Sequence, residues 1–210
     1  MKTEKDLKSE DARLREVHER FGVIQKGGRK LTVHVFLDTE TTGFGHMASP
    51  PREDAIIEVG VAYRLNGSIV KWGSICNPGE RYFINGRASE ALRINQISID
   101  DIFQAPDSFS VSERLKSILN GLGEVVLHAY NIPFDKGFLD MEPWCLSSLF
   151  KWGEDVMDIS FRYFQLPSGY KIGLAKTLER LGIMPDGTPH RADTDAVSAL
   201  IAYEIMKGGN

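Results

Sequence analysis

Acidic residues stand at the end of a strongly apolar stretch near residue 40. The segment LTVHVFLDTETTGF, residues 31–44, runs through apolar and β-branched residues and then places Asp38 and Glu40 two positions apart. Side chains two apart on a strand project from the same face, so these two carboxylates would repel each other unless a cation sits between them. A hard divalent cation is the natural partner for such oxygen ligands. The alternative is a strand that ends in solvated charges.

Two further stretches carry acidic residues in comparable positions. In HAYNIPFDKGFL, Asp135 follows an apolar strand and a proline, at the start of a predicted helix. In PHRADTDAVSAL, His190 precedes a helix whose first turns hold Asp193 and Asp195. These two aspartates lie about 200° apart around a helix, so only one of them can face the sheet. Asp195 shares its helix face with small alanines, so we predict that Asp195 points inward and that Asp193 interacts with the helix N-terminus.

The elements that must position these residues follow from the hydrophobic periodicity. We predict strands over residues 31–38, 55–65, 68–76 and 124–131, with an Asn-Gly hairpin turn at 66–67. Helical periodicity covers residues 88–98, 107–122, 134–141, 170–183 and 191–208. Strands come first and are then mixed with helices, which predicts an α/β fold with a mixed β-sheet flanked by helices.

The composition is typical of one globular domain with a polar extension. The chain has 210 residues, of which 42% are hydrophobic and 26% charged, enough for a sizeable core. Residues 1–30 read as a charged amino-terminal arm and a QKGGRK linker, so we expect the main domain at 31–207.

Charge and cysteine content narrow the classes of function. The formal net charge of -4 argues against a protein that coats duplexes through a basic face, although bound cations can supply the charge that nucleic-acid binding needs. The two cysteines, Cys76 and Cys145, have no metal-binding spacing, and no apolar run has membrane-spanning length. We therefore expect a cytoplasmic protein with reduced thiols and no membrane association.

The three acidic stretches resemble, in order and in spacing, the three motifs of the DEDD-type 3′-to-5′ exonucleases. DTETTGF, YNIPFDKGF and HRADTDA resemble the variant with a histidine five residues before the last aspartate, as in the proofreading epsilon subunit of bacterial DNA polymerase III and in ribonuclease T. The resemblance covers about residues 31–207. It implies a ribonuclease H-like fold, two bound Mg²⁺ or Mn²⁺ ions, and removal of nucleotides from a free 3′ end.

The resemblance also assigns roles to the matching residues. It makes Asp38, Glu40, Asp135 and Asp195 the metal-binding carboxylates and His190 the general base. An imidazole suits that role because its ordinary pKa, about 6.5, lies near working pH.

Residues next to the motifs are expected to contact the terminal nucleotide. The resemblance implies this role for Thr41, Thr42, Phe44, Glu58 and Asn131. Phe44 would stack on the base and Glu58 would accept a hydrogen bond from the terminal 3′-hydroxyl. Phe44 as a core aromatic and Glu58 as a structural carboxylate stay open as alternatives. Many relatives carry a His-Asn pair where this chain has Tyr130-Asn131.

Two classes of function follow from these residues. The first is an enzyme that trims single-stranded 3′ ends, and the second is a non-catalytic module of the same fold that binds a polymerase or nucleic acid. Because all five catalytic positions are filled, we expect the enzyme. The motifs DTETTGF and IIEVG favour a DNA exonuclease of the proofreading or repair type over an exoribonuclease of RNA processing. Binding in trans to a DNA polymerase, or to another replication or repair protein, stays an open alternative.

Overall fold

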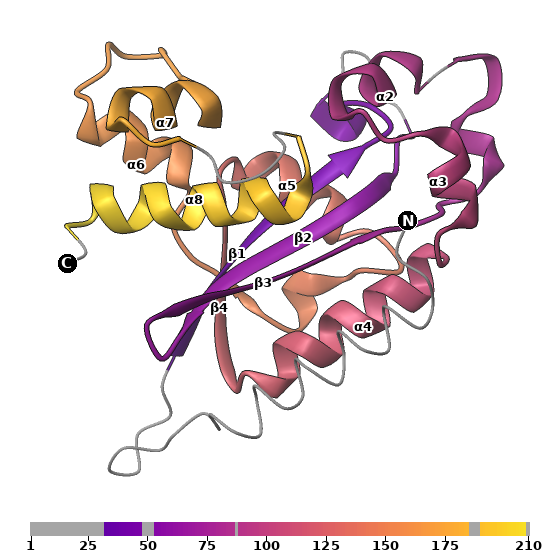
Figure 1. Cartoon of the computed structure of the whole chain (residues 1–210), viewed down its shortest axis with the longest axis horizontal. Helices are drawn as coiled ribbons and strands as arrows, with labels where there is room; N and C mark the ends of the chain where they lie inside the picture. Colours follow the sequence, from indigo (N-terminus) through magenta and orange to yellow (C-terminus); the bar gives the residue numbers. More distant parts are fainter. Residues whose placement is uncertain (1–31, 48–52, 87, 185–189, 209–210) are drawn as a thin grey trace.

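The chain folds around a five-stranded mixed sheet with helices on both faces (Figure 1). The structure is a computed structural model, and it describes residues 32–47, 53–86, 88–184 and 190–208. The predicted amino-terminal arm lies outside the described residues. The strand order is β3-β2-β1-β4-β5. β2 is antiparallel to both β1 and β3, whereas β4 is parallel to both β1 and β5, so the prediction of a mixed α/β sheet is confirmed.

The four predicted strands are present. The strands are β1 (Thr32–Thr41), β2 (Ile56–Leu65), β3 (Ser68–Ile75), β4 (Glu124–Ala129) and β5 (Lys151–Trp152). The predicted hairpin joins β2 to β3, and its central residues Asn66 and Gly67 both have positive φ, 50° and 82°, as a tight turn matched to strand twist requires. β5 was not predicted, because two residues carry no periodicity.

The predicted helices are also present, with two additions. The α-helices are α2 (Ser89–Asn95), α3 (Ile99–Gln104), α4 (Ser108–Gly121), α5 (Ile132–Leu139), α6 (Val156–Tyr163), α7 (Leu174–Leu181) and α8 (Ala192–Met206), and the 3-10 helices are Gly45–Met47, Glu80–Tyr82, Ile84–Gly86 and Leu146–Ser148. The predicted helical ranges include neither of the short helices α3 and α6. Each is capped by a side-chain oxygen, from Ser98 and Asp155, that accepts a backbone N–H of the first turn. In the part of the chain that the structure describes, no helix is long and apolar enough to cross a membrane.

The two faces of the sheet build separate hydrophobic cores. On one face Val35 and Leu37 pack with apolar residues of α4 and α5. On the other face Phe36 packs with residues of α6, α7 and α8. Because side chains alternate along a strand, Asp38 and Glu40 continue the Phe36 face toward α8, whereas Thr39 continues the opposite face toward α5. The strand pattern therefore directs the two carboxylates of β1 to the side of the sheet that α8 covers (Figure 1).

Two glycines allow α8 to begin directly on the sheet. Gly60 of β2 and Gly73 of β3 are opposite each other in the β2–β3 ladder, and Gly60 is also opposite Asp38 in the β1–β2 ladder. A Cβ at Gly60 would lie 2.1 Å from the carbonyl carbon of Ala192, and a Cβ at Gly73 would lie 2.8 Å from Cβ of Asp193. Only glycine permits this close approach. The first turn of α8 is thereby brought to the level of Asp38.

Candidate active site

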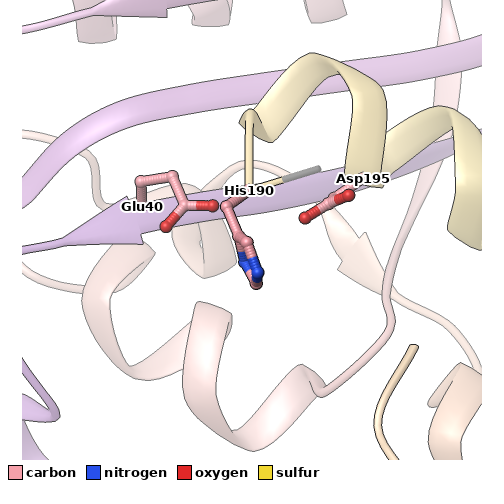
Figure 2. Close-up of side chains that lie close together, drawn as sticks. All are labelled: Glu40, His190 and Asp195. Atoms are coloured by element: carbon pink, nitrogen blue, oxygen red, sulfur yellow. The ribbon is translucent and has the colours of Figure 1, made fainter. Parts of the chain in front are cut away.

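Three of the predicted site residues meet at the end of β1. One carboxylate oxygen each of Glu40 and Asp195 and one ring nitrogen of His190 lie within 4.8 Å of one another. Figure 2 shows their origins: Glu40 projects from β1, Asp195 from the first turns of α8, and His190 from the segment that leads into α8. Glu40 and Asp195 are half-buried and His190 is exposed. His190 has φ of 60°, a left-handed conformation that is uncommon for residues other than glycine and is found at functional sites.

Asp135 is joined to the same strand by hydrogen bonds from Thr39. Its side chain is buried, and its Oδ1 accepts from the Thr39 amide at 3.1 Å and from Thr39 Oγ1 at 2.8 Å. The ladder between β1 and β4 extends only to Leu37, so the Thr39 amide lies beyond it and donates to Asp135 instead. Asn131 immediately precedes α5, and its carbonyl accepts from the Asp135 amide at 3.2 Å. Thr39 therefore links the first two acidic motifs.

Burial, together with crowding of negative charge, perturbs the carboxyl groups of β1. Burial raises the pKa of Asp38 well above its usual range, and the charges of Asp135, Glu40 and Asp195 raise it further. Burial, followed by repulsion from Asp195, raises the pKa of Glu40 to about 8, with only partial compensation from the Arg191 guanidinium. These two groups are therefore costly to ionise unless a positive charge joins them.

The carboxyls of α5 and α8 are perturbed in the same direction. Burial raises the pKa of Asp135 to about 7, even though the two hydrogen bonds from Thr39 act to lower it. Burial also raises the pKa of Asp195, opposed by the nearby His190. The pKa is therefore raised in all four carboxyl groups, which come from β1, α5 and α8.

This donor set fits a hard divalent cation. All four acidic side chains offer oxygen, which Mg²⁺ and Mn²⁺ prefer, and their mutual repulsion is relieved when a cation lies among them. The half-buried position of Glu40 and Asp195 leaves the cluster open to solvent on the side of His190. Among the described residues, the ligand atoms of Glu40, His190 and Asp195 are close enough to share one ion, and Asp38 and Asp135 stay predicted ligands beside them.

Glu58 accepts hydrogen bonds from residues at the start of α8. Its side chain is buried, and its carboxylate accepts from Arg191 Nε at 3.0 and 3.1 Å, from Arg191 Nη2 at 2.5 Å and from the Ala192 amide at 3.1 Å. Glu58 therefore has partners within the chain, as a structural carboxylate needs, and its expected role as acceptor for a 3′-hydroxyl stays a prediction. A buried carboxylate in an apolar strand requires a partner, but the sequence did not identify Arg191 as that partner.

The remaining residues expected at the nucleotide divide into buried and exposed. The Thr42 side chain is buried, and its hydroxyl donates to Asp54 Oδ1 at 3.2 Å. The Thr41 hydroxyl donates to the Gly43 carbonyl at 2.6 Å. Both hydroxyls therefore stabilise the turn that follows β1. The expected contact of Thr41 and Thr42 with the terminal nucleotide stays a prediction. Phe44 is 64% exposed, which excludes the core alternative and leaves its ring available for stacking.

Asp193 lies outside the carboxylate cluster. Its carboxylate forms an ion pair with Lys71 of β3 at 2.9 Å, and its Cβ lies over Gly73. It belongs to the first turn of α8, as predicted for a residue at the helix N-terminus. The contact with β3 was not predicted. The isolated glycine in that strand was the available signal, because glycine inside a strand often marks close backbone approach.

Comparison with known sequences places this geometry in a family. Residues 35–203 match the exonuclease family of ribonuclease T. Over 180 residues the chain is 28% identical to the DNA polymerase III subunit epsilon of Haemophilus influenzae, covering 83% of this chain and 67% of that protein. Over 113 residues it is 31% identical to the PolC-type DNA polymerase III of Staphylococcus saprophyticus, covering 53% of this chain and 7% of that much longer protein.

Comparison with solved structures gives the same fold. The nuclease domain of 3′hExo, a DEDDh family member bound to rAMP, superposes with a TM-score of 0.62 at 17% identity, covering 84% of this chain and 92% of that one. Escherichia coli exonuclease I in complex with a dT13 oligonucleotide superposes with a TM-score of 0.65 at 15% identity, covering 84% and 41%. The ribonuclease H-like fold is thereby confirmed. With its ordered motifs and the match across most of its length, the chain belongs to the DEDD-type 3′-to-5′ exonuclease family.

Proposed function

We propose that this protein hydrolyses phosphodiester bonds at single-stranded 3′ ends in a reaction that depends on divalent cations, with DNA as the preferred substrate. The observation that carries the proposal is the meeting of Glu40, His190 and Asp195 within 4.8 Å at the end of β1, with Asp38 and Asp135 in the same electrostatic cluster. Family membership supports a nuclease rather than a non-catalytic module, because every catalytic position is filled.

The carboxylates of this cluster would hold two Mg²⁺ or Mn²⁺ ions. When bound, such ions activate water and stabilise negative charge on the departing oxygen. Asp38, whose pKa the charges of Asp135, Glu40 and Asp195 raise, would contribute a ligand to the ions, and Glu40 and Asp195 lie together beside His190. Thr39 keeps Asp135 oriented by two hydrogen bonds.

His190 is proposed as the general base. Its ring is exposed beside Glu40 and Asp195, where it can accept the proton of an attacking water and pass it to solvent. Phe44 is proposed to stack on the terminal base, because its ring is exposed just after the β1 carboxylates. Asn131, half-buried just before α5, is proposed as a second contact with the terminal nucleotide.

The preference for DNA is supported by the sequence relatives. The two relatives named above are a subunit and a form of DNA polymerase III. The names of these relatives also support, as a proposal, association with a DNA polymerase. A cytoplasmic location is proposed on the sequence composition alone. The alternative substrate is RNA, favoured by a structural neighbour described as recognising a histone mRNA stem-loop, although that neighbour is 16% identical and shares only the fold.

The test uses matched 5′-labelled DNA and RNA single strands of one sequence. We expect stepwise shortening from the 3′ end, faster on DNA, abolished by excess chelator and restored by Mn²⁺. Asp195→Asn is expected to abolish the activity. Asp193→Asn, the same change on the opposite side of α8, is expected to leave most of it. Faster loss of RNA would establish the exoribonuclease alternative. Absence of shortening on both strands at every cation concentration would favour the non-catalytic module.

A further inference from the structure

Two Arg–Glu pairs, one near each end of α8, join this helix to β2. At the carboxyl-terminal part of α8, Arg64 donates from Nε and from Nη2 to the two carboxylate oxygens of Glu204, both at 2.8 Å. At its amino-terminal end, Arg191 donates from the same two nitrogens to Glu58. The settings differ, because the side chain of Glu58 is 3% exposed whereas that of Glu204 is 30% exposed.

The buried pair also satisfies the start of the helix. The first amides of a helix have no partner within it, and the residue that precedes α8, Arg191, supplies no side-chain cap of its own. Glu58 accepts from the amide of Ala192, the first residue of α8, at 3.1 Å. A carboxylate on the sheet therefore caps α8 and neutralises Arg191 at the same time, and a negative charge at this end is favoured by the helix dipole.

The pair is adjacent to the proposed catalytic groups on both of its sides. Glu58 is directly opposite Glu40 in the β1–β2 ladder. Arg191 follows His190 in the chain, and its carbonyl accepts from the Asp195 amide at 2.9 Å. A shift of the Glu58–Arg191 pair would therefore move His190 and Asp195 relative to Glu40.

We infer that Glu58 and Arg191 are positioning residues, which hold the start of α8 so that His190 and Asp195 meet Glu40. This inference rests on the proposed exonuclease function. It gives Glu58 a role different from contact with a terminal 3′-hydroxyl, because both of its oxygens already accept hydrogen bonds from Arg191 or Ala192.

The experiment compares the site-end pair with the far-end pair. The variants are Glu58→Gln, Arg191→Gln, their combination and Arg191→Lys, with Arg64→Gln and Glu204→Gln as matched controls on the same two elements. For each we would measure kcat and KM on a DNA single strand, and Mn²⁺ affinity by calorimetry without substrate. Circular dichroism would report folding.

We expect the site-end variants to lower both kcat and Mn²⁺ affinity by about 10- to 100-fold, as is usual for residues that orient metal ligands. KM should change little, because the inference gives neither side chain a contact with substrate. The combined variant should be no worse than either single one, since all three break the same pair. Arg191→Lys should recover part of the loss, because it keeps the charge but not the planar two-nitrogen contact. The controls should change neither quantity.

Three outcomes would overturn the inference. A raised KM in Glu58→Gln with unchanged kcat and Mn²⁺ affinity would make Glu58 a nucleotide contact. Additive losses in the combined variant would show that the two residues act separately, and equal losses in the controls would show a general effect of helix docking. If Arg191→Gln fails to fold because it leaves a buried carboxylate unpaired, the combined variant, which removes both charges, still decides. A wild-type protein without nuclease activity would refute the proposed function, while the Mn²⁺ calorimetry would still test the positioning.

Discussion

The crowded carboxylates predict that the site destabilises the protein when divalent cations are removed. The sharpest perturbation is Glu40→Gln, which keeps the shape of the side chain and removes one negative charge from the cluster. In chelated protein this variant should be more stable than the wild type at alkaline pH, although it should lose activity. The prediction separates the loss of folding stability caused by the crowded carboxylates from the stability that a bound cation restores.

The magnitude follows from the perturbed pKa. Glu40 changes from an ordinary 4.5 to about 8, so the folded chain holds this proton across a pH range in which the unfolded chain has released it. The free energy of unfolding therefore falls as pH rises from about 4.5 to about 8, and the cost is fully present above that window. At about 1.4 kcal/mol per pH unit the ceiling is about 5 kcal/mol. Because Glu40 is half-buried and water screens part of its charge, we expect a gain of about 1–3 kcal/mol.

The assay is urea unfolding followed by circular dichroism, in excess chelator, at about pH 5 and about pH 8.5. Glu40→Gln should be more stable than the wild type by about 1–3 kcal/mol at the higher pH and by a few tenths at the lower. Glu179→Gln, an exposed change on α7 that breaks only an ion pair with Lys176, is the control and should shift stability by less than about 1 kcal/mol at either pH. Added Mn²⁺ should stabilise the wild type more than Glu40→Gln, because only the wild type retains the full ligand set.

A Glu40→Gln protein that is less stable than the wild type in chelator at about pH 8.5 would refute this reasoning. That result would mean that favourable contacts of the Glu40 carboxylate with Arg191 and His190 outweigh its burial and its repulsion by Asp195. A gain of equal size at both pH values would also refute it, because the effect would then not arise from ionisation.

Three further predictions concern other parts of the site. His190→Ala should lower kcat by about 10²- to 10⁴-fold and leave Mn²⁺ affinity by calorimetry nearly unchanged, whereas a large loss of binding would make His190 a metal ligand. Gly60→Ala should destabilise the protein to urea by about 1–3 kcal/mol and lower kcat, because its Cβ would meet the backbone of α8, whereas Gly173→Ala, with nothing within 4 Å, should do neither. Thr39→Val should cost about 1 kcal/mol of stability to urea, because it removes the hydrogen bond from the Thr39 hydroxyl to Asp135. That bond lowers the pKa of Asp135, so its removal should raise this pKa and move the pH midpoint of Mn²⁺ binding upward; an unmoved midpoint would contradict this.

Much of the fold could be predicted from the sequence, because it follows from interactions between residues that are close along the chain. The alternation in β1 determined that Asp38 and Glu40 share a face, because successive side chains of a strand point to opposite sides. The Asn66-Gly67 dipeptide determined the hairpin, because both residues tolerate the positive φ that a tight turn requires. The order and spacing of three acidic motifs were sufficient to indicate the family, since each motif is a short segment that can be identified without knowing its tertiary contacts.

Only the tertiary structure decided how those segments meet. Arg191 contacts Glu58 across 133 positions, and Thr39 contacts Asp135 across 96. The sequence indicates that a buried Glu58 needs a partner, but which cation reaches it depends on how α8 is rotated and on how closely Gly60 lets it approach β2. The conformation of a chain follows from neighbours along it, whereas the pairing of side chains follows from how whole elements pack, and that packing is not encoded in any one segment.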